Sequence, residues 1–259
     1  MSLLPKERTK PKVDLSAFNF LLHSAPKTGK TTFASGYPDA LFLATEQGHN
    51  ALSCFKVDIV SWDTLLDVGA ELAAGGHEFK TAIIDTVDNA LAMCRLYVCK
   101  KYGVEHEADL SYGKGYALIL AEFGRVITKL SQLGLGLVMI SHSEVLEITT
   151  RTGTTHKIVP SIKDKARKLI LGMSDFIFYG DIQVVKEPDG NETLRRVWRT
   201  KPHPNYDAGD RTGRLPDPLP MDFQIFKTEF EKAVAGLAAE QAAPKTAAKP
   251  AVAKPNPSK

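Results

Sequence analysis

The chain has 259 residues, of which 43% are hydrophobic and 24% are charged, and this composition excludes a disordered or fibrous protein. Its longest apolar stretch, residues 133–140, is far shorter than the ~18 residues that a membrane span requires, and no apolar segment follows the N-terminal charges, so we expect neither a membrane protein nor a secreted one. The formal net charge of +3 is uneven, because basic residues concentrate at the two ends of a mildly acidic body, and this distribution suits local contact with nucleic acid through ends and loops.

Short apolar runs alternate with helical patterns from residue 18 onwards, after a basic N-terminal segment that spans 1–17. We expect strands at 18–23, 40–45, 57–60, 81–85 and 135–141. We expect helices near 30–36, 62–73, 86–101 and 115–132. This alternation predicts an α/β domain with a mostly parallel sheet that helices cover on both faces.

Beyond residue 141 the pattern changes to antiparallel hairpins. Two β-rich runs, 145–150 and 155–159, flank the turn Arg151-Thr152-Gly153-Thr154, and two more, 182–186 and 193–198, flank Pro188-Asp189-Gly190-Asn191. An amphipathic helix near 222–235 is expected to close a single domain that spans 18–236. The last residues, 237–259, are mostly Ala, Pro and Lys, and they bury too little apolar surface to offset the entropy of ordering them. We expect them to form a disordered tail, which either adds nonspecific DNA affinity or only keeps the protein soluble.

The strongest motif is Ser24-Ala25-Pro26-Lys27-Thr28-Gly29-Lys30-Thr31, followed by Thr32, which joins an expected strand to an expected helix. The pattern G-x-x-x-x-G-K-[S/T] provides backbone N–H groups that converge on phosphate oxygens, a lysine that reaches the outer phosphates and a hydroxyl that binds Mg²⁺. Lys30 and Thr31 supply the lysine and the hydroxyl. Ser24 departs from the pattern, since it stands in place of the first glycine, but a small residue is compatible with that turn. We therefore predict a nucleotide-binding loop.

A second motif, Ala82-Ile83-Ile84-Asp85-Thr86, is an apolar strand that ends in a carboxylate. An Asp in this place can hold Mg²⁺ through a water molecule. Many P-loop ATPases have the carboxylate that polarises the attacking water directly after this Asp, but Thr86 occupies that position here. Glu46 is the candidate base, because it ends the strand at 40–45 and ligands of open α/β sheets bind at the carboxyl ends of strands. The alternative is a carboxylate that caps the next segment. No N-K-x-D motif for reading guanine is present, so ATP is favoured over GTP.

The order of these motifs, completed by the apolar strand Leu137-Val138-Met139-Ile140-Ser141-His142, resembles the ATPase core of the RecA/RadA recombinases. Three runs resemble phage-encoded P-loop proteins more closely, among them AAA-domain nucleotide-binding proteins and shortened RecA-like single-strand annealing recombinases. These runs are Tyr112-Gly113-Lys114-Gly115-Tyr116, Ile140-Ser141-His142-Ser143 and Ala208-Gly209-Asp210-Arg211-Thr212-Gly213-Arg214-Leu215-Pro216. The resemblance covers roughly residues 18–232, and it implies a RecA-like P-loop NTPase fold.

The resemblance implies a role for each matching residue of the site. Lys30 and Thr31 contact the phosphates and Mg²⁺, Asp85 holds a metal-bound water, and Glu46 acts as the general base. His142 lies where RecA proteins have a polar residue, usually Gln, that senses the γ-phosphate and relays its presence to the DNA-binding loop. The alternative for His142 is a histidine whose hydrogen bonds are satisfied at a strand end.

In RecA-like filaments, basic residues late in the core reach the ATP of a neighbouring subunit. Arg199 and Lys201 are two apart in an extended segment, so their side chains point to one face and suit such a role. The alternatives are a solvated basic pair, or Arg211 and Arg214 as the residues that cross the interface.

The resemblance also marks 101–116 and 144–163 as mobile DNA-binding loops. The first segment carries Lys114 between Tyr112 and Tyr116, and the second carries Arg151, Lys157 and Lys163. Cations that contact phosphates beside rings that stack on bases form a single-strand surface, although tyrosines that flank glycines are more often packing residues. The expected function is an ATP-dependent, single-stranded-DNA-binding recombination or annealing protein of phage type.

This function implies a homo-oligomer, either a filament or a ring, and the family suggests dependence on the host's single-strand-binding protein. Two other classes stay open: a nucleotide switch that binds ATP and a protein partner without DNA, and a small-molecule kinase. A kinase requires an Arg-rich lid, whereas the basic residues here cluster at 195–214. Cys54, Cys94 and Cys99 lack the spacing of zinc ligands, so we expect reduced, buried thiols and a cytoplasmic protein, in the host cytoplasm if a phage encodes it.

Overall fold

The computed structural model describes residue 4 and residues 9–151, 153–186 and 190–242. Several features that the sequence suggested lie outside the described residues. They are the N-terminal Lys6 and Arg8, Thr152 and Pro188-Asp189 of the two expected turns, and the tail from residue 243.

All the expected strands are present, most of them with shifts of one or two residues at their ends. The strands are β1 Asn19–Ser24, β2 Ala40–Ala44, β3 Phe55–Asp58, β4 Thr81–Asp85, β5 Gly136–Thr150, β6 Gly153–Pro160, β7 Phe176–Lys186, β8 Glu192–Arg199, β9 Gly209–Asp210 and β10 Leu219–Pro220. The runs expected at 135–141 and 145–150 are one continuous strand, β5. The second hairpin is also longer than expected, because β7 begins at Phe176 rather than at 182.

The expected helices are present as well. The helices are α1 Lys30–Ala34, α2 Trp62–Ala74, α3 Val87–Lys101, α4 Lys114–Ser131, α5 Asp164–Met173 and α6 Phe223–Ala242, with 3-10 turns at Leu15–Ala17, Glu107–Asp109 and Ser111–Gly113. Helix α5 was missed. Helix α6 continues past the expected end at 235, so the expectation of disorder was wrong for 237–242, where Leu, Ala, Glu and Gln favour a helix.

The sheet has the strand order β10-β8-β7-β1-β5-β4-β2-β3, and the run from β7 to β3 is parallel. One strand, β5, lies between β1, which leads into the phosphate loop, and β4, which ends in Asp85. The remaining pairs, β7 with β8, β5 with β6, β8 with β10 and β7 with β9, are antiparallel. The predicted α/β class, with a mostly parallel sheet and antiparallel hairpins after it, is therefore confirmed.

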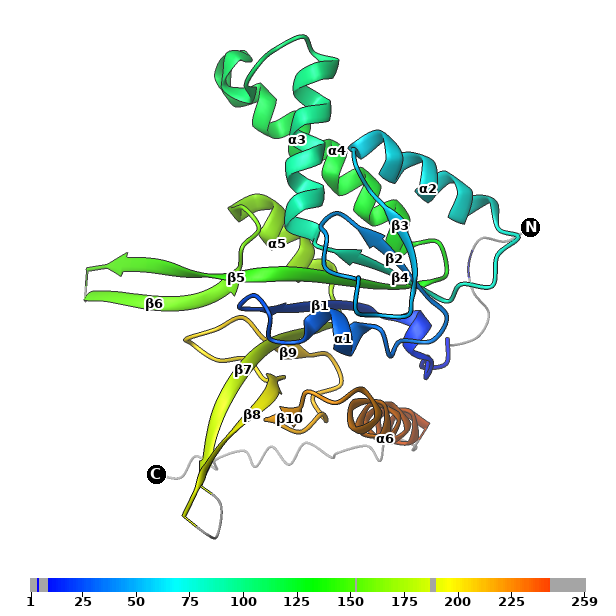
Figure 1. The fold of residues 1–259 in the computed structure, drawn as a ribbon, viewed down its shortest axis with the longest axis vertical. Helices are drawn as coiled ribbons and strands as arrows, with labels where there is room; N and C mark the ends of the chain where they lie inside the picture. Colours follow the sequence, from blue (N-terminus) through cyan, green and yellow to red (C-terminus); the bar gives the residue numbers. More distant parts are fainter. Residues whose placement is uncertain (1–3, 5–8, 152, 187–189, 243–259) are drawn as a thin grey trace, which may run out of the picture.

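Side chains that alternate along the central strands build a core on each face of the sheet. Leu21 of β1 packs with α2, α3, α4 and α5, whereas its neighbours Phe20 and Leu22 pack with α1 and α6 on the other face. Figure 1 shows these two helix layers above and below the strands. Because both neighbours of β1 are strands and both of its faces are covered, the end of β1 is a rigid support for the loop that follows.

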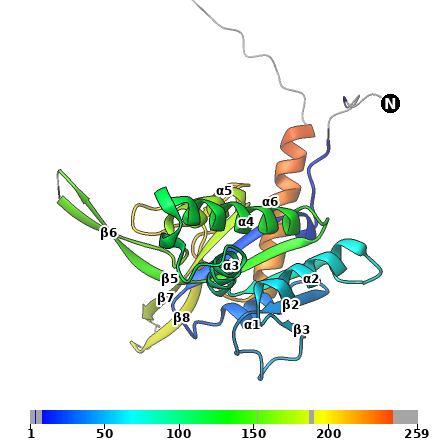
Figure 2. The ribbon, with the colours of Figure 1, turned by 90° about the horizontal axis from the view of Figure 1, so that it is seen from above.

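Both hairpins project beyond the helix layers (Figure 1). Seen from above, the β5–β6 hairpin extends well beyond the rest of the domain (Figure 2). Its outer residues are exposed, including Val145 and Ile148, and the outer half of the β7–β8 hairpin exposes Ile182, Val184 and Leu194.

Two of the three cysteines are buried as expected, while Cys54 is only partly buried; all three are free thiols. Burial raises the pKa of the Cys94 thiol to about 12, so this group stays protonated and unreactive. Among the described residues, no helix is both long and apolar enough to cross a membrane.

Candidate nucleotide-binding site

The run 24–31 forms a loop between the carboxyl end of β1 and the start of α1. Gly29 precedes the helix with φ of 105°, a conformation that favours glycine, and Lys27 has φ of 61°. The Nζ of Lys30 turns back over the loop and donates to the carbonyl oxygens of Ser24, at 3.1 Å, and Ala25, at 3.0 Å. Burial lowers the pKa of Lys30, and nearby carboxylates partly oppose that shift. The lysine is thus a buried cation held at the centre of the loop.

Ser24 takes the place of the first glycine because it is still part of a strand. It is the last residue of β1. Ser24 is not among the described non-glycine residues with a positive φ, which include Lys27. Its Oγ hydrogen-bonds with Oγ1 of Thr28 and accepts from Nζ of Lys30 at 3.2 Å. The serine therefore replaces the glycine without backbone strain and adds a hydroxyl to the loop.

Asp85 lies against the start of α1. Its Oδ2 accepts a hydrogen bond from Oγ1 of Thr31 at 2.8 Å, and Nε2 of His49 lies 3.2 Å from the same oxygen. Burial raises the pKa of Asp85, while the Thr31 hydrogen bond and the neighbouring His49 oppose the rise. His49 is 3% exposed and was not predicted, although it follows Glu46 by only three residues.

Thr31 and Asp85 suit a magnesium ion. Among the described residues, the buried Oδ1 of Asp85 has no hydrogen-bond partner, and it lies beside a hydroxyl on a lysine-lined loop. A hard cation that keeps several waters and otherwise binds phosphate oxygens needs few protein ligands. Among the described residues there is no group of three or more His, Cys, Asp or Glu side chains suited to a metal.

Glu46 and His142 approach each other from either side of the carboxyl end of β4, since Glu46 follows β2 and His142 lies on β5. Oε2 of Glu46 lies 3.5 Å from Nε2 of His142 and accepts from the amide of Asn89 at 3.4 Å. Both side chains of the Glu46–His142 pair are about one third exposed, so water reaches the carboxylate. Asn89, on the first turn of α3, is a contact that the sequence did not suggest.

Asp88 fixes the strand that carries His142. Its two carboxylate oxygens accept from Oγ of Ser141 at 2.6 Å, the backbone N–H of His142 at 2.7 Å and Oγ of Ser161 at 3.1 Å. Burial raises the pKa of Asp88, and these hydrogen bonds oppose the rise. Asp88 therefore links β5 to the residue that follows β6, at the base of the hairpin.

One cleft of about 300 Å³ brings most of the predicted site residues together. The predicted residues that line it are Lys27, Gly29, Lys30, Thr31, Thr32, Glu46, Asp85 and His142. Arg196 of β8 also lines it and was missed, because no local motif marks it. A P-loop, a buried carboxylate, a partly exposed carboxylate and three cations in one cleft can bind a polyphosphate and activate water beside it.

The four candidate interface residues lie elsewhere, each paired with a carboxylate of its own chain. Arg199 contacts Asp181 at 2.9 Å and Lys201 contacts Asp210 at 3.3 Å. The rivals are paired in the same way, Arg211 with Asp175 and Arg214 with Glu240.

The two expected DNA-binding segments are separate in space. Residues 101–116 form the outer end of the α3–α4 pair (Figure 1), where Tyr112 is fully exposed with φ of 56° and Tyr116 is 52% exposed. Residues 144–163 are mostly the β5–β6 hairpin. Arg151 and Lys163 are exposed, whereas Lys157 pairs with Asp207 at 2.6 Å.

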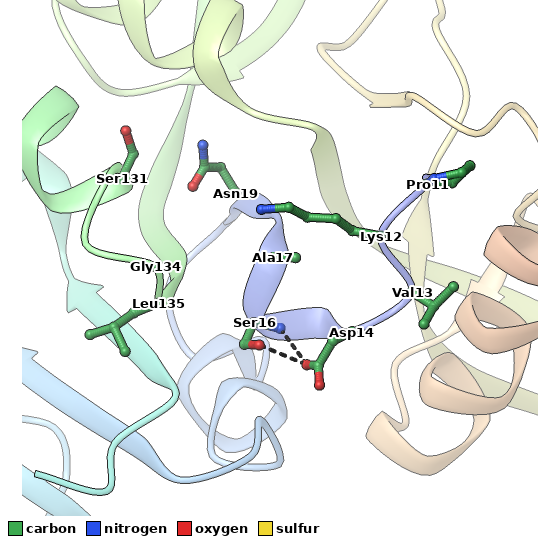
Figure 3. A pocket seen from close by; sticks show the side chains of 10 residues that line it. All are labelled: Pro11, Lys12, Val13, Asp14, Ser16, Ala17, Asn19, Ser131, Gly134 and Leu135. Atoms are coloured by element: carbon green, nitrogen blue, oxygen red, sulfur yellow. Dashed lines mark hydrogen bonds between the residues drawn. The ribbon is translucent and has the colours of Figure 1, made fainter. Parts of the chain in front are cut away.

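A second hollow lies at the opposite edge of the sheet, near the amino ends of β1 and β5 (Figure 3). Among the described residues that line it, Lys12 is the only cation, and the carboxylate of Asp14 accepts hydrogen bonds from the hydroxyl and the backbone N–H of Ser16. Because the carboxylate of Asp14 already accepts these local hydrogen bonds, this hollow offers no chemistry comparable to that of the cleft.

The profile of the AAA domain family matches residues 17–212, and this range includes every residue of the cleft. The chain belongs to the AAA domain family. Membership of this family and the loop geometry together make the cleft of this AAA domain the candidate nucleotide site.

Relatives of this AAA domain include the SPbeta prophage-derived uncharacterized protein YorG of Bacillus subtilis (strain 168). The two are 25% identical over 164 residues, which cover 61% of this chain and 49% of that protein, so the chain spans about half the length of this relative. Two solved structures are similar to the AAA domain. The KaiC-like protein PH0186 of Pyrococcus horikoshii OT3 is 14% identical, with 75% of this chain and 88% of that chain covered and a TM-score of 0.42. The flagellar accessory protein FlaH of Methanocaldococcus jannaschii is 8% identical, with 71% and 77% covered and a TM-score of 0.38.

Proposed function

We propose that this AAA-domain protein hydrolyses ATP with Mg²⁺ and couples hydrolysis to single-stranded DNA, as a recombination or annealing protein of phage type. One observation carries the proposal: the candidate base Glu46 touches His142, and His142 lies on the strand that continues into the β5–β6 hairpin. A change at the terminal phosphate has a direct structural route to a projecting element.

In the proposed reaction, Lys30 and the loop N–H groups hold the phosphate chain. Thr31 would bind Mg²⁺ directly and Asp85 through a water molecule, and the ion would neutralise charge on the phosphates. Glu46 accepts a proton from a water molecule, and the water oxygen attacks the γ-phosphorus as the bond to ADP breaks. Glu46 suits this role because it is one third exposed and its partners, Asn89 and His142, orient it without excluding water.

The coupling depends on how tightly the hairpin base is held. Asp88 bonds Ser141 and the backbone of His142 on β5 and reaches Ser161 just beyond β6. Glu144, two residues after His142, pairs with Arg167 of α5 at 3.1 Å. A shift of the His142 side chain toward or away from Glu46 is therefore transmitted along a strand whose surroundings are rigid.

Single-stranded DNA would contact the hairpin and the outer end of α3–α4. Tyr112 combines a positive φ with a fully exposed side chain, which is rare for a bulky residue. Strained backbone conformations of this kind are often found at functional sites. Tyr112, Tyr116 and Lys114 offer rings for stacking beside a cation. Arg151 at the tip of the hairpin and Lys163, which caps α5 just beyond β6, are exposed and positive.

The other parts of the proposal concern assembly. We infer a homo-oligomer, a filament or a ring, in which Arg199 and Lys201 leave Asp181 and Asp210 to reach the ATP of a neighbour. The prophage origin of the 25% identical relative supports the phage context, in which the host's single-strand-binding protein is the expected partner.

The decisive experiment is the ATPase rate with and without single-stranded DNA, with Lys30→Ala as the control for contaminating ATPase. We expect Mg²⁺-dependent hydrolysis that single-stranded DNA accelerates and duplex DNA accelerates less. Hydrolysis that no DNA changes would contradict the DNA part and favour a nucleotide switch with a protein partner.

A further inference from the structure

Arg196 extends from β8 toward the phosphate loop. Side chains two apart on a strand share a face, so Arg196 lies on the same face as Trp198. Trp198 is fully buried against Phe33 of α1, with 5.1 Å between ring centroids, so this face of β8 is the one that meets the P-loop helix. Near the edge of that contact, Nη1 of Arg196 donates to the carbonyl oxygen of Thr28 at 3.2 Å.

The guanidinium is also packed against the next residue of the loop. A Cβ at Gly29 would lie 2.7 Å from Nη1 of Arg196, so the guanidinium occupies the space that a side chain at this position would need. The backbone of Arg196 is fixed on both sides, because residue 196 pairs with Ile182 of β7 and its carbonyl accepts from the N–H of Met221 at 3.0 Å. The side chain is thus presented from rigid structure.

The charge of Arg196 has no counter-ion in the described part of the chain. Its neighbours differ, since Arg199 pairs with Asp181 and Lys201 with Asp210. A guanidinium stays charged at neutral pH and offers five N–H donors in a planar fork that matches phosphate oxygens. Thr28 occupies part of one end of the fork, and the side chain lines the cleft that also holds Lys30 and Thr31.

We propose that Arg196 is a nucleotide-binding residue that contacts the phosphate chain of ATP within its own subunit. It supplies a second fixed cation beside Lys30 and closes the side of the phosphate loop that β8 covers. This assignment rests on the nucleotide site of the proposed function and is independent of DNA. It differs from the roles of Arg199 and Lys201, which concern a neighbouring subunit.

The test is calorimetric titration of the full chain with ATP and with ADP, both with Mg²⁺. We expect Arg196→Ala to weaken ATP binding roughly 10- to 100-fold, the usual effect of losing a hydrogen-bonded charge. Arg196→Lys keeps the charge but loses the fork, so it should restore only part of the affinity. Arg195→Ala removes the same charge from the other face of β8 and should bind ATP as the wild type does. Unchanged thermal unfolding of the nucleotide-free variants would show that the fold is intact.

Wild-type affinity in Arg196→Ala, or an equal loss in Arg195→Ala, would overturn the proposal. The same titrations separate it from the larger proposal. If the unmodified protein does not bind ATP, or if Lys30→Ala binds it normally, the nucleotide site fails and Arg196 fails with it. If Arg196→Ala loses affinity while DNA leaves the ATPase rate unchanged, the assignment of Arg196 stands and only the DNA partner is rejected.

Discussion

Ser24 of β1 lies directly opposite Gly180 of β7, and a Cβ at Gly180 would be 2.8 Å from the Cβ of Ser24. The loop has a serine where its pattern has a glycine, and the neighbouring strand has a glycine where a side chain would collide with that serine. The side chain of Ser24 fills the space that a side chain at position 180 would need. The glycine in β7 therefore accommodates the departure from the P-loop pattern.

Gly180→Ala should therefore destabilise the protein by about 1–3 kcal/mol, because the new methyl group would also crowd Met221 and Trp198, at 3.0 and 3.1 Å. Ser24→Gly removes the closest contact and should recover part of the loss in the double variant. Denaturant unfolding of the two single variants and the double variant measures the coupling. Strictly additive effects would show that the two residues do not constrain each other.

Glu46→Gln should bind ATP as the wild type does and hydrolyse it ~10² to 10⁴-fold more slowly, because the amide keeps the shape of the side chain but cannot accept the proton. Single-turnover hydrolysis and calorimetric binding measure the two effects. Glu71→Gln, which makes the same change on an exposed part of α2, is the matched control. Normal hydrolysis by Glu46→Gln would move the base to another residue.

His142→Ala should leave ATP affinity near the wild-type value and reduce the acceleration of ATPase by single-stranded DNA, because the contact between Glu46 and the hairpin strand is lost. His142→Gln retains a hydrogen-bond donor and should recover part of the acceleration. The ratio of rates with and without DNA is the measurement. If single-stranded DNA still accelerates the ATPase of His142→Ala fully, His142 has no role in coupling and only ends the buried part of β5.

Arg199→Ala and Lys201→Ala test the assembly. If these residues act across an interface, either variant mixed with Glu46→Gln should be more active than each variant alone, since some interfaces then combine an intact base with an intact cation. Arg211→Ala and Arg214→Ala, mixed in the same way, test the rival pair. Mixtures that only average the activities of their components would indicate a site completed within one subunit.

His23 should make stability depend on pH. Its ring is fully buried, with Nε2 donating to the carbonyl of Asp207 at 2.7 Å and Nδ1 accepting from the hydroxyl of Ser143 at 2.8 Å. Burial lowers the pKa of His23 from 6.5 to about 4, against smaller opposing effects of Asp207. The unfolded chain therefore takes up a proton at higher pH than the folded chain does. The neutral ring makes its full contribution to the free energy of unfolding above pH 6.5. This contribution is lost as the pH falls toward 4, and the total loss is about 3 kcal/mol.

Denaturant unfolding between pH 7.5 and pH 4.5 measures this dependence. His23→Gln can replace both hydrogen bonds without titrating, so the stability of this variant should fall less steeply over the same range. Equal slopes for the two proteins would contradict the assignment of a neutral, buried ring.

Sequence patterns determined the elements whose signals are local. The P-loop could be predicted because its lysine, hydroxyl and glycine are adjacent in the chain, and β4 could be predicted because four apolar or β-branched residues precede Asp85. Glu46 followed from the rule that parallel strands end at one edge of the sheet. By the same rule the structure brings Glu46, Asp85 and His142 into one cleft.

Longer elements were only partly predicted, because local signals are weak where tertiary contacts decide. The first half of β7 is an apolar run without a turn signal, and it becomes a strand by pairing with β1. Helix α6 extends over an Ala-rich segment whose composition alone resembles a linker, and there Glu240 meets Arg214.

The partners of the charged side chains were decided only by the tertiary structure. Arg196, Arg199 and Lys201 lie within six residues of one another, and no local pattern shows which of them meets the nucleotide loop. The alternation of β8 puts Arg196 on the face of Trp198, and the strand order brings that face to Thr28, 168 residues earlier in the chain. The register with β7 places Arg199 opposite Tyr179 and within reach of Asp181. A charge is placed by register and sheet order, which depend on the packing of the whole domain, whereas a phosphate loop depends on the conformation of a few consecutive residues.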